Sequence, residues 1–450
     1  MCDMRSDDIQ CWLDATSDAV SPEPAPRTAH DGAPDNRAKR RRLNNPPSLR
    51  LTPPSSNRNH DRGHTLAMAS SGKRQLDDDT PRAKRIQTSD RSSHGRLSER
   101  SSSRARSGRS SPLKKTLRVL EHDPNGLEMR PLESLDEIPD ALMALFLDVQ
   151  AFANGSGIVS TEARVALADA SSADARNFLW TTSGSDLWTD DPAVYTPRPE
   201  DVLNIKADTL ECSRKRHIEA NWNMEVHRDM LCMAFRHYPA AQRYKQLVNF
   251  TGATTAAIMP EYGHHTASKK VDFCVYAEPK NDATLTDTYW LAADRMRKAL
   301  PEEVLNFTDF EALDGRFIGL SIETKKPSEG LELSQLQLGV WEMARWRFLR
   351  RLAAGFDDEN EDIFSAAETR AARAARLPAF LPGLIVQGDA WYFVATTAEG
   401  NRTVLWQKLF IGSSANTRGI YQIVRILQYL GKWVSDVYWP CVRRMLEEAE

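Results

Sequence analysis

The chain has 450 residues and a formal net charge of −3, long enough for one large domain or two smaller ones. No run of about 18 apolar residues is present, so no membrane-spanning helix is indicated. The N-terminus lacks the apolar stretch of a secretory signal peptide, and we expect a protein that is not secreted. The six cysteines are scattered, without a CxxC pair or a histidine at zinc spacing, which favours buried reduced thiols.

The charge is divided unevenly along the chain. Residues 1–118 carry 24 basic and 14 acidic side chains, a net charge of +10, whereas the remainder carries 35 and 48, a net charge of −13. The first part is rich in Ser, Pro and Arg and almost free of aromatics, so it cannot bury enough apolar surface to offset its chain entropy. We therefore expect a disordered basic region over 1–118 and a globular domain over 119–450.

Short motifs in the N-terminal region suggest partners. The basic cluster Arg37–Arg42 and the clusters within Lys73–Arg85 are typical of nuclear-localisation signals, although such runs can also serve solvation alone. Ile9, Trp12 and Leu13 form an apolar patch at helical spacing, which is either a protein-docking motif or a transient helix. We expect binding to the nuclear import machinery and a nuclear location, with the cytoplasm as the alternative.

The first half of the globular part alternates helices and short strands. A helix begins near residue 141, loops are expected over 170–200, and one long helix is expected from Ser213, as its N-cap, to Tyr238. Strands are expected over 254–259, 271–276 and 316–325. The segment 278–315 reads as an insertion that loops out and contains a helix at 290–300.

The second half continues this alternation. A helix over 333–352 and a connector over 353–380 precede three strands, over 383–387, 391–395 and 403–410, with a hairpin turn at Gly400. Helices over 416–433 and 439–449 end the chain. The order predicts an α/β domain with a central mixed sheet and helices on both faces.

The strand over 316–325 carries the most informative chemistry. Glu323 and Lys325 are two residues apart, so both side chains point to the same face of the strand. A carboxylate and a lysine on one strand, with Asp272 on another, form the set that a Mg²⁺-dependent nuclease needs. A second Glu-x-Lys occurs at Glu278–Lys280, but its central proline would interrupt a strand, so we prefer Glu323 and Lys325.

Helical periodicity adds two residues, Glu219 and Gln337, to the candidate site residues. Glu219 shares the packing face of its helix with Trp222 and Asn223, and a carboxylate on such a face needs a partner. Gln337 lies at the centre of the apolar stripe of the helix over 333–352, whereas Gln335 is expected on the outer face. A glutamine in a buried stripe must find hydrogen-bond partners.

The same residues carry a resemblance. The phrases Glu219-x-x-Trp-Asn, Val271-Asp-Phe, Ser321-Ile-Glu-Thr-Lys and Gln337-Leu-Gly-Val-Trp occur in this order. So do Asn306-Phe-Thr-Asp-Phe, Leu381-Pro-Gly-Leu-Ile-Val-Gln-Gly and Tyr421-Gln-Ile-Val. The chain over about 120–450 thus resembles the fungal PD-(D/E)XK nuclease-like domain family. The resemblance implies a restriction-endonuclease-like three-layer αβα core. Two departures are Val271 in place of the proline of the family name and the long gap between Asp272 and Glu323.

The resemblance also implies roles. Asp272, Glu323 and Glu219 would hold Mg²⁺, with Mn²⁺ possible, while Lys325 and Gln337 would complete the catalytic set. The expected reaction is hydrolysis of phosphodiester bonds in nucleic acid, with DNA favoured over RNA. Because the domain is acidic, the alternative is a catalytically silent nuclease-like fold that binds nucleic acid or protein.

Overall fold

The computed structural model describes residues 111–132, 137–169, 185–264, 270–327, 329–355 and 372–448. The motifs expected at Ile9, Trp12 and Leu13, at Arg37–Arg42 and at Lys73–Arg85 lie outside these residues, as does most of the expected connector. None of the helices in the described ranges is long and apolar enough to cross a membrane. The first helix, α2 (Pro112–His122), crosses the expected boundary between residues 118 and 119.

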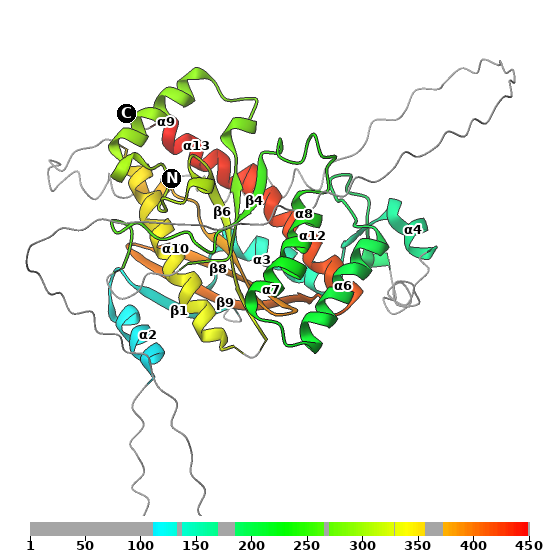
Figure 1. Cartoon of the computed structure of the whole chain (residues 1–450). Coiled ribbons are helices and arrows are strands. Elements are labelled where there is room, and N and C mark those ends of the chain that lie inside the picture. The colour runs from blue at the N-terminus through cyan, green and yellow to red at the C-terminus, as the bar shows by residue number, and fades with distance from the viewer. Residues whose placement is uncertain are drawn as a thin grey trace, which may run out of the picture. The chain divides into compact units, whose positions relative to one another are not determined.

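The centre of the fold is a seven-stranded mixed sheet with the order β1-β9-β8-β7-β6-β5-β4 (Figure 1). β6 pairs in parallel with β7 and antiparallel with β5, and β1 pairs in parallel with β9. The strands are β1 (Leu127–Pro131), β4 (Val248–Gly252), β5 (Phe273–Ala277), β6 (Phe317–Lys325), β7 (Leu381–Gln387), β8 (Ala390–Glu399) and β9 (Arg402–Ser413). A separate two-stranded sheet joins β2 (Val159–Ser160) and β3 (Trp188–Thr189).

Strand β6 lies in the interior of this sheet, next to the central strand β7, and its composition explains why. Every residue from Phe317 to Lys325 is buried, as expected for a strand that is covered on both faces and therefore reads as a nearly continuous apolar run. The chain leaves β6, passes through helix α10 (Leu331–Ala354) and returns in parallel as β7. A parallel pair requires such a crossover, which is usually helical.

Helices flank the sheet and complete the layers predicted from sequence. α10 packs along β6, β7 and β9, while α3 (Asp140–Ala153) and α12 (Thr417–Trp433) pack on β9 (Figure 1). The remaining helices are α4 (Arg164–Ala168), α6 (Pro199–Arg214), α7 (Glu219–Trp222), α8 (Arg228–Phe235), α9 (Asp287–Ala299) and α13 (Trp439–Glu447). The expected fold class, a mixed α/β sheet with flanking helices, is confirmed.

The helix expected from Ser213 to Tyr238 is wrong in its start and its continuity. Ser213 lies in the last turn of α6, which ends at Arg214, and the new helix begins at Glu219. α7 runs into a π-helical turn, η4 (Asn223–His227), and then into α8. α6 itself was not predicted, because its polar, acidic first turn follows a segment that reads as loop.

Two further expectations need correction. No strand forms over 254–259, where the described chain contributes only an isolated bridge from Ile258 to Thr308. The edge strand is β4 instead, whose mixed sequence gives little alternation. The expected strands at 271–276, 316–325, 383–387, 391–395 and 403–410 and the helix at 290–300 all form, with bounds shifted by a few residues.

A bulge in β6 is shaped by Gly319. The pairing register between β5 and β6 shifts next to this residue. A Cβ atom built at Gly319 would lie 2.5 Å from the Val434 side chain. Val434 opens a second π-helical turn, η8 (Val434–Tyr438), which links α12 to α13. Glycine is therefore needed where the sheet and this turn approach each other closely.

Candidate active site

The predicted strand residues meet at one end of the β5–β6 pair. Asp272 immediately precedes β5, and its backbone N–H donates to Ile322 O at 3.0 Å. Glu323 and Lys325 close β6. Because β5 and β6 run antiparallel, the start of one lies beside the end of the other. The arrangement brings Asp272, Glu323 and Lys325 to the same cavity, of about 350 Å³, together with Glu219 and Gln337.

Lys325 is the centre of this group. Its Nζ lies 2.7 Å from Glu323 Oε1 and 3.2 Å from Glu219 Oε2, and it donates to Thr324 O at 2.8 Å. The Lys325 side chain is 9% exposed and that of Glu323 is 1% exposed. A buried ammonium between two carboxylates is compensated electrostatically, which is the condition for keeping such charges inside a protein.

Glu219 reaches the cavity from the first residue of α7. Its side chain is 34% exposed, so it lies at the mouth while Glu323 lies at the floor. A carboxylate in the first turn of a helix interacts favourably with the helix dipole. The predicted packing face is observed around it: Trp222, Asn223, Val226 and Met230 are all buried.

A second set of contacts holds Asp272. Its Oδ2 accepts from the Thr324 backbone N–H at 2.8 Å and from the Thr324 hydroxyl at 2.9 Å, and its Oδ1 accepts from Asn223 Nδ2 at 3.2 Å. The Thr324 hydroxyl oxygen also lies 2.8 Å from Asn223 Oδ1, and its single proton is shared between this oxygen and Asp272 Oδ2. These contacts fix the carboxylate but leave Oδ1 with one long hydrogen bond and free acceptor capacity.

His227 lies behind this set. Its Nδ1 is 2.8 Å from Asn223 Oδ1 and its Nε2 is 2.7 Å from Gly388 O. The ring lies between Trp222 and Trp391, at centroid distances of 5.9 and 5.7 Å. Burial lowers the pKa of His227 to about 4, so the imidazole is neutral near pH 7. A neutral ring has a single N–H and both partners are oxygen acceptors, so it donates to only one of Gly388 O and Asn223 Oδ1. His227 lies behind Asn223 and does not line the cavity.

The electrostatics of the cavity favour a bound cation. Burial raises the pKa of Glu323 to about 8, the nearby negative charge of Asp272 adds to this shift, and Lys325 opposes it. Burial also raises the pKa of Glu219. For Lys325, burial alone would lower the pKa, but Glu323, Glu219 and Asp272 together raise it above its usual value. The raised pKa values mean that ionising these carboxyl groups together is unfavourable, and a bound cation would relieve that cost.

The donor set fits a hard divalent ion. Glu323 Oε1 is buried and has the Lys325 ammonium as an ion-pair contact but no aligned hydrogen bond. The donor atoms of Glu219, Asp272 and Glu323 do not all come within 4.8 Å of one another. Mg²⁺ is held by one or two carboxylates and keeps several waters. Two of the three carboxylates that line the cavity would therefore be enough to hold such an ion, and the third would contact it through water.

Gln337 lines the cavity from α10, where it is partly exposed. Gln335, expected on the outer face of this helix, is instead only 4% exposed. The expectation is wrong for both glutamines: Gln337, expected in the buried stripe, is partly exposed, and Gln335 is buried because α10 is covered on most of its circumference from Ser334 onward. The apolar stripe alone could not show this, since a second layer of structure covers the opposite side.

The rival Glu-x-Lys lies at the other end of β5. Glu278 Oε2 accepts from Arg316 Nε at 2.6 Å, and Lys280 lies in a short 3-10 turn begun by Pro279. Neither residue lines the cavity of Asp272 and Glu323. The structure therefore keeps the two Glu-x-Lys sequences apart.

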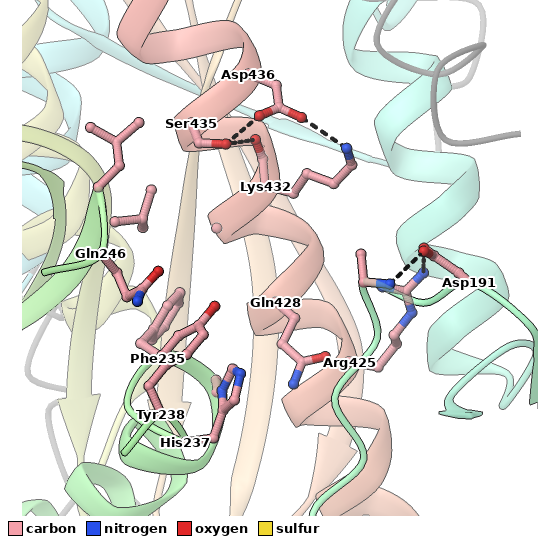
Figure 2. A pocket seen from close by; sticks show the side chains of 15 residues that line it. Asp191, Phe235, His237, Tyr238, Gln246, Arg425, Gln428, Lys432, Ser435 and Asp436 are labelled. Carbon is pink, nitrogen blue, oxygen red and sulfur yellow. Dashed lines mark hydrogen bonds and ion pairs between the residues drawn. The ribbon is translucent and has the colours of Figure 1, made fainter. Parts of the chain in front are cut away.

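A different cavity, of about 400 Å³, opens between α8 and α12 (Figure 2). The cations there already have partners: Arg425 lies 4.0 Å from Asp191, and Lys432 lies 2.9 Å from Asp436. Figure 2 shows both pairs at its rim. None of the predicted site residues lines it, and its charges cancel locally. The candidate active site is therefore the cavity at the β5–β6 end.

Sequence reasoning missed Asn223, His227 and Thr324 as site residues. A signal existed for Asn223, since helical phase places this polar side chain on the same buried face as Glu219. Thr324 gave none, because the alternation that puts Glu323 and Lys325 on one face turns Thr324 to the other. Thr324 belongs to the site only through its contacts with Asp272 and Asn223, which are distant in the sequence.

A mixed sheet with flanking helices, and an Asp/Glu-x-Lys set at the end of two central strands, define the nuclease-like fold class. Residues 166–439 match the family model described as the PD-(D/E)XK nuclease superfamily. The chain belongs to this superfamily, whose nucleases typically use divalent metal ions. Comparison with curated proteins and with solved structures gave no match.

Proposed function

We propose that this protein is a Mg²⁺-dependent nuclease that hydrolyses phosphodiester bonds, with DNA as the favoured substrate. The observation that supports this most directly is the position of Lys325 Nζ, 2.7 Å from Glu323 and 3.2 Å from Glu219 in a cavity shared with Asp272. This is the residue set that the superfamily pattern requires. Membership of a fungal branch and use of Mn²⁺ are part of the same proposal.

Each residue has a role that follows from its position. Asp272 and Glu323 would hold the ion with carboxylate oxygens. A bound Mg²⁺ would polarise the phosphoryl group and lower the pKa of water. Lys325 supplies a compact positive charge for the phosphate oxygens that gain charge in the transition state. Glu219, at the mouth, and Gln337, on the facing helix, orient water and the scissile phosphate.

The test is a cleavage assay of the full chain on single-stranded DNA, duplex DNA and RNA, with Mg²⁺, with Mn²⁺ and with chelator. Lys325→Ala should lower the rate by at least about 10²-fold, as expected when one charge-stabilising donor is lost. Lys326→Ala is the matched control, because Lys326 is the next lysine and points away, to Glu329 at 3.1 Å. Equal rates for the parent and Lys325→Ala would sink the proposal.

A second candidate is a catalytically silent module that binds nucleic acid or protein. It is favoured by the three contacts of Lys325 Nζ, to Glu219, to Glu323 and to Thr324 O. These contacts leave the ammonium group little capacity to bind a phosphate, unless a metal ion takes its place beside Glu323. The net charge of −13 over residues 119–450 also disfavours a broad duplex-binding face. No cleavage by the parent with either metal, together with measurable binding, would favour this candidate.

We also propose that the basic N-terminal region directs the protein to the nucleus and adds contact with nucleic acid. The charge of +10 over residues 1–118 supports this, since such a region attracts phosphate backbones and import receptors alike. A fluorescent protein fused to residues 1–118 should accumulate in nuclei. Replacing Arg40, Arg41 and Arg42 by alanine should lower accumulation, with the clusters within Lys73–Arg85 still present, whereas replacing Arg104, Arg106 and Arg109 should leave it unchanged.

A further inference from the structure

A second set of metal-binding side chains lies outside the nuclease cavity, where α6 meets α7. Cys212 Sγ lies 3.5 Å from Glu225 Oε2, and His217 Nδ1 lies 3.7 Å from the same oxygen. The three donor atoms all lie within 4.8 Å of one another. Among the described residues, this is the one group of three such side chains that meets this condition. Cys212 is buried and free, as expected, but the proximity of His217 was not predicted from the sequence.

The spacing matches tetrahedral zinc. Zinc bonds of about 2.3 Å to sulfur and about 2.0–2.2 Å to nitrogen and oxygen place neighbouring ligand atoms roughly 3.4–3.6 Å apart. The Cys212–Glu225 and His217–Glu225 separations, 3.5 and 3.7 Å, lie close to these edges before any ion is present. The 3.7 Å separation between His217 Nδ1 and Glu225 Oε2 is too long for a hydrogen bond. His217 Nδ1 is a buried atom without a hydrogen-bond partner in the described structure.

The backbone fixes two of the three ligands. α6 ends in a Schellman motif, in which the His217 N–H donates to Cys212 O at 2.9 Å and the Arg216 N–H donates to Ser213 O at 3.2 Å. Arg216 takes the left-handed conformation, at φ 52°, that this motif normally assigns to glycine. The motif usually brings two apolar side chains together, but here it brings a thiol and an imidazole together.

The third ligand comes from the π-helical turn. Glu225 lies in η4, two residues after Asn223, and its side chain turns back toward the end of α6. The extra residue in a π turn changes the direction of the side chains that follow it, and such turns are frequent at functional sites. Helical phase from Glu219 also directs Glu225 away from the nuclease cavity. Glu219 therefore lies at the nuclease cavity, whereas Glu225 lies beside Cys212 and His217.

We propose that Cys212, His217 and Glu225 form a zinc site, with water in the fourth position. A mixed sulfur, nitrogen and oxygen set suits Zn²⁺, whereas Mg²⁺ prefers oxygen ligands alone. The ion would tie the end of α6 to η4 and so hold the turn that presents Asn223 to Asp272. The site does not depend on whether the protein cuts nucleic acid.

The test is a titration of the full chain with Co²⁺, used as a spectroscopic substitute for Zn²⁺. A thiolate bound to Co²⁺ gives a charge-transfer band, so the signal reports on a cysteine site and is blind to the all-oxygen nuclease site. The band should appear with one equivalent of Co²⁺ and disappear when Zn²⁺ is added. Binding should also raise the melting temperature of the full chain.

Cys212→Ser should abolish the band, and Cys232→Ser, at a half-buried position in α8, should leave it unchanged. Because Cys212 is buried and its variant could fold poorly, His217→Ala and Glu225→Gln provide the second measurement. The side chains of His217 and Glu225 are partly exposed. Loss of a residue that only hydrogen-bonds to a metal ligand weakens metal binding roughly 10- to 100-fold, so each of these variants, which removes a ligand itself, should weaken Co²⁺ binding by more than that. A band that survives in all three variants, or no band in the parent, would overturn the proposal.

Discussion

Thr324 donates twice to the same oxygen of Asp272, through its backbone N–H at 2.8 Å and through its hydroxyl at 2.9 Å. Thr324 lies in β6 and Asp272 immediately precedes β5, and the two residues are held together by both main chain and side chain. Asp272, which lines the cavity, is therefore oriented before any ligand arrives. Preorganisation of this kind is what metal-binding carboxylates obtain from their hydrogen-bond partners.

The first prediction concerns this pair. Thr324→Val keeps the shape of the side chain and the backbone hydrogen bond but removes the hydroxyl, which also contacts Asn223 Oδ1. We expect Mg²⁺ affinity to fall by about 10-fold or more, as for other outer partners of metal ligands. Isothermal titration with Mg²⁺ or Mn²⁺ measures this. Thr324→Ser restores the hydroxyl and should bind normally, and an unaffected valine variant would contradict the role given to Thr324.

The second prediction is a pH dependence of metal binding. The metal-free pKa of Glu323 is about 8, raised by burial and by Asp272, so below this pH the ion must displace a proton. Mg²⁺ affinity should therefore rise as the pH increases toward about 8, by up to tenfold per unit, and level off above it. Titrations between pH 6 and pH 9 check this. A flat profile over that range would show that Glu323 is already ionised.

The third prediction concerns acid stability and His227. Its pKa is about 4 in the folded protein because the ring is buried, against about 6.5 when the chain unfolds. Above pH 6.5 the ring is neutral in both states, and as the pH falls from 6.5 to 4 the unfolded chain takes up the proton first. The free energy of unfolding should therefore fall by about 3 kcal/mol between pH 6.5 and pH 4 because of His227 alone.

Urea denaturation at pH 7, 5.5 and 4.5 measures that loss. His227→Gln removes the titrating group, so its free energy of unfolding should fall less steeply over the same interval, whatever its value at pH 7. His122→Gln is the matched control, because His122 is exposed at the end of α2. Parallel slopes for the parent and His227→Gln would rule out this assignment.

The fourth prediction uses the left-handed residue at the end of α6. Arg216 has φ 52°, a conformation that costs an L-residue with a Cβ atom roughly 1 kcal/mol and costs glycine almost nothing. Arg216→Gly should raise the free energy of unfolding by about 0.5–1 kcal/mol, measured in chelator so that metal binding does not contribute. Lys215→Gly, at an ordinary helical position, should lower it instead.

The elements that sequence predicted well share one property. β6, β7, β8 and α10 are buried over most of their length, so apolar periodicity or a continuous apolar run marks them directly. The elements it missed, α6 and the edge strands β1 and β4, carry many polar residues, and their formation depends on neighbours distant in the chain. β1, for example, pairs with β9, which lies more than 270 residues further along.

The site shows the same division. Glu323, Lys325 and Glu219 follow from alternation and helical phase, which are local rules. Thr324 and His227 become part of the site only through contacts with Asp272 and Gly388, and no local rule predicts those contacts. The break between α6 and α7 was also hidden, because its left-handed residue is an arginine and not the glycine that normally marks a helix end.

The pairing of β1 with β9 has a practical consequence for shorter versions of the chain. The family match begins at residue 166, yet Leu127–Pro131 covers the edge of β9, and Arg130 anchors it to Glu399 at 2.6 Å. A fragment cut at residue 166 would leave that edge of the sheet without its partner strand. Exposed edges recruit strands from other molecules, so such a fragment should aggregate, whereas one that begins at residue 111 should remain monodisperse.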